Sequence, residues 1–164
     1  MTDELVSETS AFQGKCLTFN LGDEYYGVKV EWIMQIIAIP EITTIPKTPP
    51  FVKGVINLRG KIIPVVDLRL RFKLSEKEYD ERTSIVIIKI RADRHDLFIG
   101  IIVDNVLEVL EIHESEIEKT PLFGVDLDTQ YILCMAKVKS KVVTLLDMDK
   151  VLTDVDLSQI KMTK

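Results

Sequence analysis

The chain has 164 residues, of which 46% are hydrophobic and 29% are charged, and its formal net charge is −5. This composition is typical of a globular chain with a buried core, and the negative charge argues against nucleic-acid binding, which favours basic patches. No apolar run approaches the ~20 residues that cross a bilayer, and the acidic N-terminus has no apolar stretch of a signal peptide. Cys16 and Cys134 lie in apolar-patterned stretches and are expected to be buried, reduced thiols.

Signals typical of β-strands dominate the first half of the chain. Residues 15–22 and 23–30 alternate apolar and polar positions around a Gly-Asp break, which predicts a hairpin. Residues 31–37 are predicted to form one helical turn. The stretch 38–50 holds four prolines, which bar a helix interior or a central strand, so it is expected to be an extended edge segment and loop.

A second hairpin is predicted over residues 51–69, which read "FVKGVINLRGKIIPVVDLR". Gly60 is expected to take a positive φ at the turn, and Pro64 indicates that its strand is an edge or is bulged. Asp67 stands where the N-cap of a short following helix belongs, because a carboxylate can accept hydrogen bonds from the first free N–H groups. Arg59 at the turn is either a plain surface cation or half of an orienting ion pair, with a nearby carboxylate or with a partner residue.

The second half of the chain is predicted to be β-rich as well. A charged loop over 75–82 is followed by predicted strands, a connector, a last hairpin and a short amphipathic helix. The predicted elements are strands at 83–90, 95–104 and 105–112, a connector over 114–130, a hairpin of 131–138 with 141–147, and a helix over 148–160.

An internal repeat links the two halves. "KIIPVVDLRLRF" (61–72) matches "KVVTLLDMDKVL" (141–152), and "GVKVEWIMQII" (27–37) matches "GIIVDNVLEVL" (100–110), at offsets of 80 and 73 residues. We infer an all-β fold of two related units of about five strands each, closed into small barrels that share one core. In this repeat Asp67 corresponds to Asp147, which predicts a second helix cap.

The chain lacks the residue patterns that usually mark catalysis. His95 and His113 have no metal-ligand spacing with each other or with a cysteine, and the scattered glycines form no phosphate-binding loop. We therefore expect a binding protein with no enzymatic activity, no cofactor and no metal. Ile33 and its repeat partner Val106 could be core or surface residues, and both readings stay open at this stage.

Taken together, these stretches resemble the CheW family, the coupling proteins of bacterial chemotaxis. The most specific match is "TPPFVKGVINLRGKIIPVVDLRLRF" (48–72), and the resemblance runs from about Phe12 to Leu152. It implies two five-stranded SH3-like β-barrel subdomains around a shared hydrophobic core, with short helices. We expect a CheW-like domain over 12–153, with subdomains of roughly 12–82 and 83–153 and exchange of strands between them left open. The tails, 1–11 and 154–164, are expected to be flexible or helical.

The resemblance also implies a function. Members of this family are non-catalytic adaptors that bind the regulatory domain of the histidine kinase CheA and the cytoplasmic tips of chemoreceptors. The chain is then expected to be cytoplasmic and recruited to membrane-associated receptor arrays, without inserting into the membrane. Two alternatives remain open: a CheW-like scaffold in a motility or gene-regulatory array, and a small-barrel nucleic-acid-binding protein, against which the net charge argues.

Site residues follow from the resemblance position by position. The receptor-binding candidates are Ile33, Gly54, Arg59, Ile85 and Val106. The kinase-binding candidates are Ile42, Thr44 and Ile45, in the proline-rich segment. Many family members carry a glutamate where this chain has Gln35, so Arg59 is expected to pair with another acid, Glu31 being one candidate, or to direct its charge at the receptor.

Overall fold

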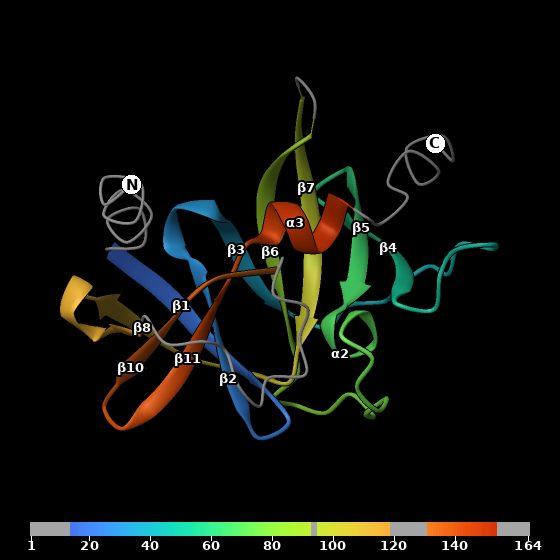
Figure 1. Cartoon of the computed structure of the whole chain (residues 1–164). Coiled ribbons are helices and arrows are strands. Elements are labelled where there is room, and N and C mark those ends of the chain that lie inside the picture. Colours follow the sequence, from blue (N-terminus) through green and yellow to red (C-terminus); the bar gives the residue numbers. More distant parts are fainter. Residues whose placement is uncertain (1–13, 93–94, 119–130, 154–164) are drawn as a thin grey trace.

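The computed structural model describes residues 14–92, 95–118 and 131–153. Its strands form two sheets, which lie side by side in Figure 1. Sheet A contains, in spatial order, β8 (Asn105–Ile112), β1 (Gly14–Leu21), β2 (Glu24–Lys29), β11 (Lys141–Leu146), β10 (Ile132–Val138) and β9 (Ile117–Glu118). Sheet B contains β3 (Ile33–Ala38), β6 (Ser84–Ala92), β7 (His95–Val103), β5 (Lys61–Asp67) and β4 (Val52–Leu58). The helical pieces are the 3-10 turns η1 (Val30–Trp32) and η2 (Glu114–Glu116) and the short helices α2 (Leu68–Arg71) and α3 (Met148–Thr153).

The predicted all-β class is confirmed, and the two sheets are consistent with paired SH3-like barrels. Sheet B has the expected five strands, whereas sheet A has six because the two-residue strand β9 adds to β10. The predicted hairpins are present as the antiparallel pairs β1–β2, β4–β5 and β10–β11, and the strands predicted at 83–90 and 95–104 pair antiparallel as β6 and β7. These pairs join neighbouring segments, which local patterning and turn residues specify well.

The chain passes from sheet A to sheet B and back again. Strands β1 and β2 belong to sheet A, the strands between residues 33 and 103 belong to sheet B, and strands β8 to β11 belong to sheet A again. The two sheets therefore do not follow a simple division into 12–82 and 83–153, because each of those halves contributes strands to both. The predicted tails, 1–11 and 154–164, lie outside the described residues.

The helical turn predicted over 31–37 is wrong for most of its length. Only η1 is helical, and Ile33–Ala38 forms strand β3, which pairs antiparallel with β6 from Ile33↔Ile88 to Ala38↔Ser84. Along β3 the side chains alternate between half-buried and exposed, which is the period of two of a strand with one face on a core. Pairing with β6 thus determines that this segment is a strand, although its local sequence does not distinguish helix from strand.

Pro64 lies in β5, which is an internal strand between β4 and β7 and so departs from the predicted edge. The proline is tolerated because the parallel ladder with β7 begins only at Val65↔Gly100. At Pro64 itself the strand is paired on one side, with Val55 of β4. The register of this hairpin also shifts between Val52 and Gly54, so the pairing is bulged nearby.

The internal repeat is visible in the pairing register. Strand β5 runs parallel to β7 with Val65 opposite Gly100, and β11 runs parallel to β2 with Leu145 opposite Gly27. These are repeat-equivalent pairs at the offsets of 80 and 73 residues. A Cβ at Gly100 would lie 2.7 Å from Ile85 Cγ2, and one at Gly27 would lie 2.9 Å from Leu145 Cδ2. Glycine is therefore needed at this position in both parallel strand pairs.

Both predicted helix caps are present. Asp67 Oδ1 accepts hydrogen bonds from the backbone N–H of Arg69 (2.9 Å) and Leu70 (3.4 Å) at the start of α2. Asp147 Oδ1 accepts one from Lys150 N (3.3 Å) at the start of α3. The second oxygen of Asp67 accepts a hydrogen bond from the hydroxyl of Tyr79 (2.7 Å), a contact that the sequence did not suggest.

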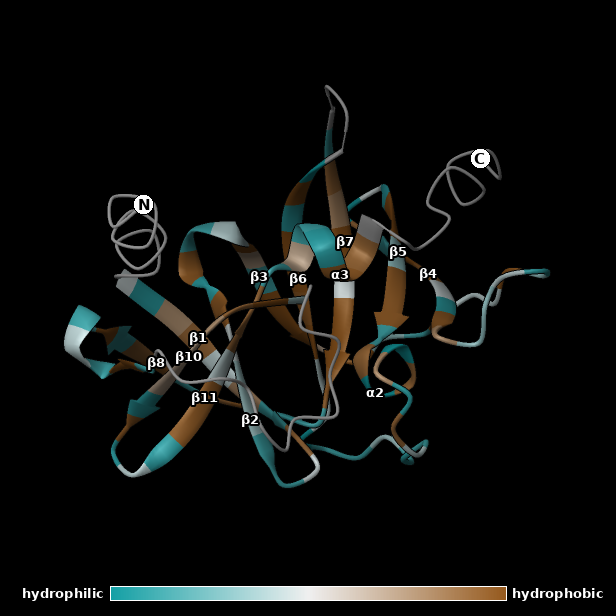
Figure 2. Ribbon diagram, in the orientation of Figure 1, coloured by the Kyte–Doolittle hydropathy of each residue, from teal (hydrophilic) through white to brown (hydrophobic). Residues whose placement is uncertain are grey.

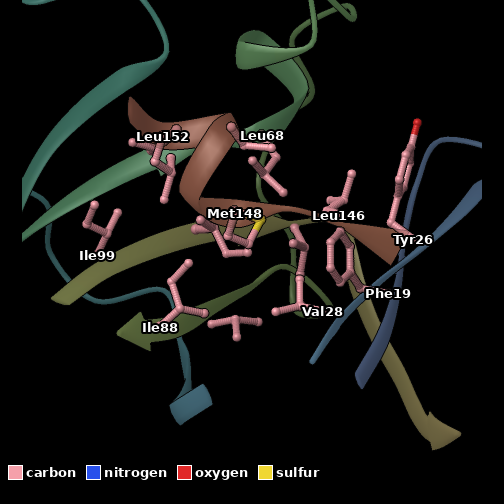
Figure 3. Packing of buried hydrophobic residues seen from close by; sticks show 14 of the residues in the cluster. Phe19, Tyr26, Val28, Leu68, Ile88, Ile99, Leu146, Met148 and Leu152 are labelled. Carbon is pink, nitrogen blue, oxygen red and sulfur yellow. The ribbon is translucent and has the colours of Figure 1, made fainter. Parts of the chain in front are cut away.

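One hydrophobic core joins the two sheets, and Figure 2 shows hydrophobic residues along the strands of both. Figure 3 shows side chains from sheet A, sheet B and both helices converging on it. Leu68 and Met148, which begin α2 and α3 and are repeat-equivalent, are both fully buried there. Since burying one such side chain contributes about 1.5–3 kcal/mol, this common core holds the two sheets together. The shared core that the sequence predicted is present.

Candidate functional site

The tip of the β4–β5 hairpin presents Arg59 to solvent. Arg59 and Gly60 both have positive φ, 54° and 85°, as a type I′ turn requires. The carboxamide oxygen of Asn57 accepts a hydrogen bond from Gly60 N (2.9 Å) and braces the turn. The guanidinium of Arg59 has no ion pair or hydrogen bond among the residues that the structure describes. Its charge is therefore available to a partner.

The repeat-equivalent turn in sheet A is built alike but is charge-paired. Lys139 and Ser140 have φ of 51° and 68°, and Lys139 Nζ lies 3.7 Å from Glu108 Oε1. Gln35 is the repeat equivalent of Glu108, so sheet B has no carboxylate at the matching position. Glu31, the other acid considered for Arg59, lies 3.9 Å from Lys29 Nζ instead.

Ile33 and Val106 lie at corresponding places in the two sheets. Each begins or nearly begins an edge strand, β3 or β8, just after the chain has crossed from one sheet to the other. Both side chains are half-buried and pack against the shared core. They are thus partly core and partly surface, and each keeps some apolar area that a partner could cover.

Ile85 has a different environment from the one expected of a contact residue. Its side chain is 0% exposed and packs inside sheet B with Ile63, Val65 and Ile87. Direct contact between this side chain and a receptor is excluded in this conformation. The physical reason is that alternate residues of β6 point to opposite faces of sheet B, where Ile85 and Ile87 pack into one apolar cluster and Val86 and Ile88 pack into the shared core.

Gly54 is buried, and its role depends on its backbone conformation and on the absence of a side chain. It has a φ of 141°, and a Cβ there would collide with the carbonyl oxygen of Thr43 and lie 2.7 Å from the carbonyl carbon. The absence of a side chain lets the proline-rich segment approach β4, where Thr43 N donates to Val55 O (2.9 Å) and Val55 N to Thr43 O (2.8 Å). Gly54 therefore shapes the surface near it without contributing a side chain to it.

The kinase-binding candidates lie along this proline-rich segment. Thr44 is exposed. Ile42 is half-buried against the sheet B cluster that contains Ile85, and Ile45 is half-buried against the shared core. The two backbone hydrogen bonds between Thr43 and Val55 fix the segment across β4. Thr44 is consequently the one of these three whose side chain is mostly free for contact.

Sequence reasoning missed a set of exposed apolar side chains. In sheet B they are Met34, Ile36 and Ile62, and in sheet A they are Leu107, Val109 and Val142. At the repeat offsets these six residues are three equivalent pairs, and Ile62 is the most exposed at 64%. Alternation over 33–38, combined with the repeat, could have revealed them. Met34 and Ile36 lie two residues apart on β3, and Leu107 and Val109 lie two residues apart on β8, so each of these edge strands carries two exposed apolar side chains on one face.

A buried ion pair lies where the chain crosses from β7 to β8. Arg69 of α2 donates through Nε and Nη2 to the two carboxylate oxygens of Asp104, each at 2.7 Å. Gly22 N, in the turn between β1 and β2, donates to Asp104 Oδ2 at 2.8 Å. Burial alone would raise the pKa of Asp104, but these hydrogen bonds, together with the positive charges of Arg69 and Lys77, outweigh burial and hold the pKa below its ordinary value.

The described residues include few other side chains that could react or bind a metal. Burial raises the pKa of the Cys16 thiol to about 11 and that of Cys134 to about 12, so both stay protonated near neutral pH. Within 14–92, 95–118 and 131–153, no cluster of three or more His, Cys, Asp or Glu side chains could hold a metal ion. None of the helices in these ranges is long and apolar enough to span a membrane.

Comparison with known proteins gives consistent matches over most of the chain. The family model described as CheW-like domain matches residues 15–156. The chemotaxis protein CheW of Klebsiella aerogenes is 34% identical over 142 residues, which cover 87% of this chain and 83% of that protein. The chemotaxis protein CheW of Bacillus subtilis is 37% identical over 84% of this chain and 86% of that protein.

A solved structure agrees with the sequence relatives. The crystal structure of the scaffolding protein TtCheW from Thermoanaerobacter tengcongensis has a TM-score of 0.76 and 34% identity to this chain. The match covers 87% of this chain and 94% of that one. Because the family model, the relatives and the fold all match over nearly the whole described chain, the protein belongs to the CheW-like domain family.

Proposed function

We propose that this chain is a non-catalytic chemotaxis adaptor that couples the cytoplasmic tips of chemoreceptors to the histidine kinase CheA. In this function it is a cytoplasmic protein that is recruited to membrane-associated receptor arrays by its partners. Membership of the CheW-like domain family supports the proposal. The observation that carries it is the state of Arg59.

Arg59 holds a conformation that its side chain disfavours. A left-handed backbone costs a residue other than glycine about 1–2 kcal/mol, and asparagine or glycine would suit this turn better. Among the described residues, no ion pair of Arg59 offsets this cost, whereas Lys139 in the equivalent turn has one. An exposed, unpaired guanidinium in a rigid turn suits recognition of a carboxylate on a receptor helix.

The proposed receptor surface comprises Ile33, Val106 and Arg59. Ile33 and Val106 supply apolar area at the border of the shared core, and Arg59 supplies the charge that fixes register. Gly54 and Ile85 act indirectly in this proposal. Gly54 seats the proline-rich segment, and Ile85 packs under the Gly100 crossing.

The proposed kinase surface is the proline-rich segment with Ile42, Thr44 and Ile45, together with the matching exposed apolar residues of the two sheets. CheA carries a regulatory domain of the same family, so a barrel-on-barrel contact would use similar surfaces on both partners. The edge strands β3 and β8 carry two of these apolar residues each. Apolar side chains on exposed edges are costly for a free protein and are explained by a partner that covers them.

The test is a pair of asparagine variants at the two equivalent turns. Arg59→Asn removes the charge and suits the positive φ, and Lys139→Asn does the same in sheet A. We expect Arg59→Asn to weaken co-sedimentation with receptor tips about tenfold, which is the effect of 1.4 kcal/mol. Lys139→Asn should leave receptor binding unchanged.

The melting temperature of Arg59→Asn should stay equal or rise, because asparagine fits the turn better than arginine does. Full receptor binding by Arg59→Asn would contradict the role given to the arginine. A wild-type chain that fails to bind a CheA regulatory domain at micromolar concentrations would contradict the adaptor function itself.

A further inference from the structure

The chain crosses between the two sheets at two repeat-equivalent places. The first is at η1, between β2 and β3, and the second is at Asp104, between β7 and β8. Ile33 directly follows the first crossing, and Val106 lies two residues beyond Asp104. The geometry of these two crossings therefore sets how far apart, and at what angle, Ile33 and Val106 are presented.

The second crossing is held by directional bonds to both sheets. Asp104 is 8% exposed and receives the fork of Arg69, from α2 at the end of β5 in sheet B. It also receives the N–H of Gly22, from the β1–β2 turn of sheet A. Arg69 in turn donates through Nη1 to Ser75 O at 2.9 Å, so the guanidinium is itself held in place.

The first crossing lacks this clamp. Glu31 corresponds to Asp104 in the repeat, but its side chain is 72% exposed and its carboxylate lies 3.9 Å from Lys29 Nζ. Asp149 of α3 corresponds to Arg69, so the equivalent residues are two acids that cannot form a pair of this kind. One crossing is thus fixed by charge-assisted hydrogen bonds, and its equivalent is not.

We propose that Arg69 and Asp104 are positioning residues that fix the orientation of sheet A relative to sheet B, and thereby the spacing of Ile33 and Val106. The shared core holds the sheets together through apolar contacts, which are individually non-directional. A bidentate guanidinium–carboxylate pair is directional. The consequence for receptor binding rests on the proposed function, whereas the orientation of the sheets does not.

Arg71 makes a second connection between the sheets, in addition to the clamp formed by Arg69 and Asp104. Arg71 of α2 donates to Val151 O and to the hydroxyl of Tyr131, each at 2.9 Å, and stacks between Phe51 and Tyr131. It joins α2 to the start of β10 and to α3. With Arg71 in place, loss of the Asp104 clamp is expected to permit rotation about α2 rather than separation of the sheets.

Residual dipolar couplings of backbone amides test the orientation in the free protein. In the wild type, one alignment tensor should fit the couplings of both sheets. Asp104→Asn keeps the size of the side chain but removes the charge, and the two sheets should then require different tensors. Glu31→Gln, at the equivalent and exposed position, is the matched control and should behave as the wild type does.

Two further variants separate positioning from folding. Arg69→Gln should reproduce the effect of Asp104→Asn, and Arg69→Lys, which keeps the charge but loses the bidentate fork, should retain only part of the common orientation. Within each sheet the amide shifts should stay close to wild type, which a partly unfolded variant would not show. If both Asp104→Asn and Arg69→Gln keep one tensor with the wild-type orientation, the proposal is overturned.

Binding to a receptor tip gives the functional arm of the experiment. Asp104→Asn should bind about tenfold more weakly, within the range of typical couplings between sites, and Glu31→Gln should bind normally. Wild-type affinity in a variant whose sheets have rotated would overturn the link to Ile33 and Val106. If the wild type itself does not bind, the proposed function fails, and the dipolar couplings still decide the positioning role.

Discussion

Gly54→Ala is expected to be among the most damaging single-methyl changes that this fold offers. The added Cβ would meet the carbonyl group of Thr43, which is backbone and cannot move aside as a flexible side chain would. Alanine would also be held at a φ of 141°, where a side chain costs about 1–3 kcal/mol. Relief of the collision requires the proline-rich segment to leave β4.

The size of the effect follows from what is lost with that segment. The hydrogen bonds from Thr43 N to Val55 O and from Val55 N to Thr43 O contribute about 0.5–1.5 kcal/mol each. Together with backbone strain, the expected loss of unfolding free energy is about 2–6 kcal/mol. Since a domain has only about 5–15 kcal/mol of stability, this variant should be strongly destabilised.

Gly60→Ala provides the matched control. Gly60 also has a positive φ, 85°, but nothing lies within 4 Å of a Cβ built there. Its cost is therefore backbone strain alone, about 1–2 kcal/mol. Urea unfolding of both variants measures the difference, and hydrogen exchange locates it, because the amides of Thr43 and Val55 should lose protection only in Gly54→Ala. Equal losses of stability, with both amides still protected, would refute the reasoning.

Two other predictions concern titratable groups. Because the pKa of Asp104 is lowered in the folded state, its contribution to stability is complete above the unfolded pKa and is lost as the pH falls through the folded pKa. Below about pH 5, the unfolding free energy should fall less steeply with pH for Asp104→Asn than for the wild type. The same slope in both proteins would contradict the pairing. Burial raises the pKa of Cys16 from 9.0 to about 11, so alkylation at pH 8 should be about 100-fold slower in the folded than in the unfolded chain. Cys134 should be slowed at least as much, and similar rates in both states would show that the thiols are not buried as described.

The parts of the fold that the sequence predicted are those with local causes. The hairpins, the Asp67 and Asp147 caps and the positive φ of Gly60 each depend on residues a few positions apart. The repeat predicted two like units, and the pairing of Val65 with Gly100 and of Leu145 with Gly27 confirms its alignment. Parallel pairing and the return of β8 to β1 join residues far apart in the chain, and no local pattern specifies such partners.

The candidate site was predicted in part. Arg59 stood out because a turn needs no arginine, and the structure leaves its charge exposed. The burial of Ile85 could have been inferred from its own strand, since the continuous apolar run "IVII" is typical of a strand covered on both faces. The Arg69–Asp104 pair could not, because each residue has an ordinary local role, and only the crossing of the chain brings them together.

The two repeats differ most where the fold itself makes the weakest demand. Glycine at positions 27 and 100 and aspartate at 67 and 147 are the same in both copies, because a close crossing and a helix cap require them. The charges at the turns and at the crossings recur in both copies, but their partners do not. Lys139 lies 3.7 Å from Glu108, whereas the position equivalent to Glu108 in the copy that contains Arg59 is Gln35. Arg69 pairs with Asp104, whereas their equivalents are two acids. Each of these pairs occurs in only one of the two copies, so folding of a single unit does not require it. On the function proposed above, the charge of Arg59 on sheet B is available to a receptor, and we propose that the Arg69–Asp104 pair keeps Val106 of sheet A in register with it.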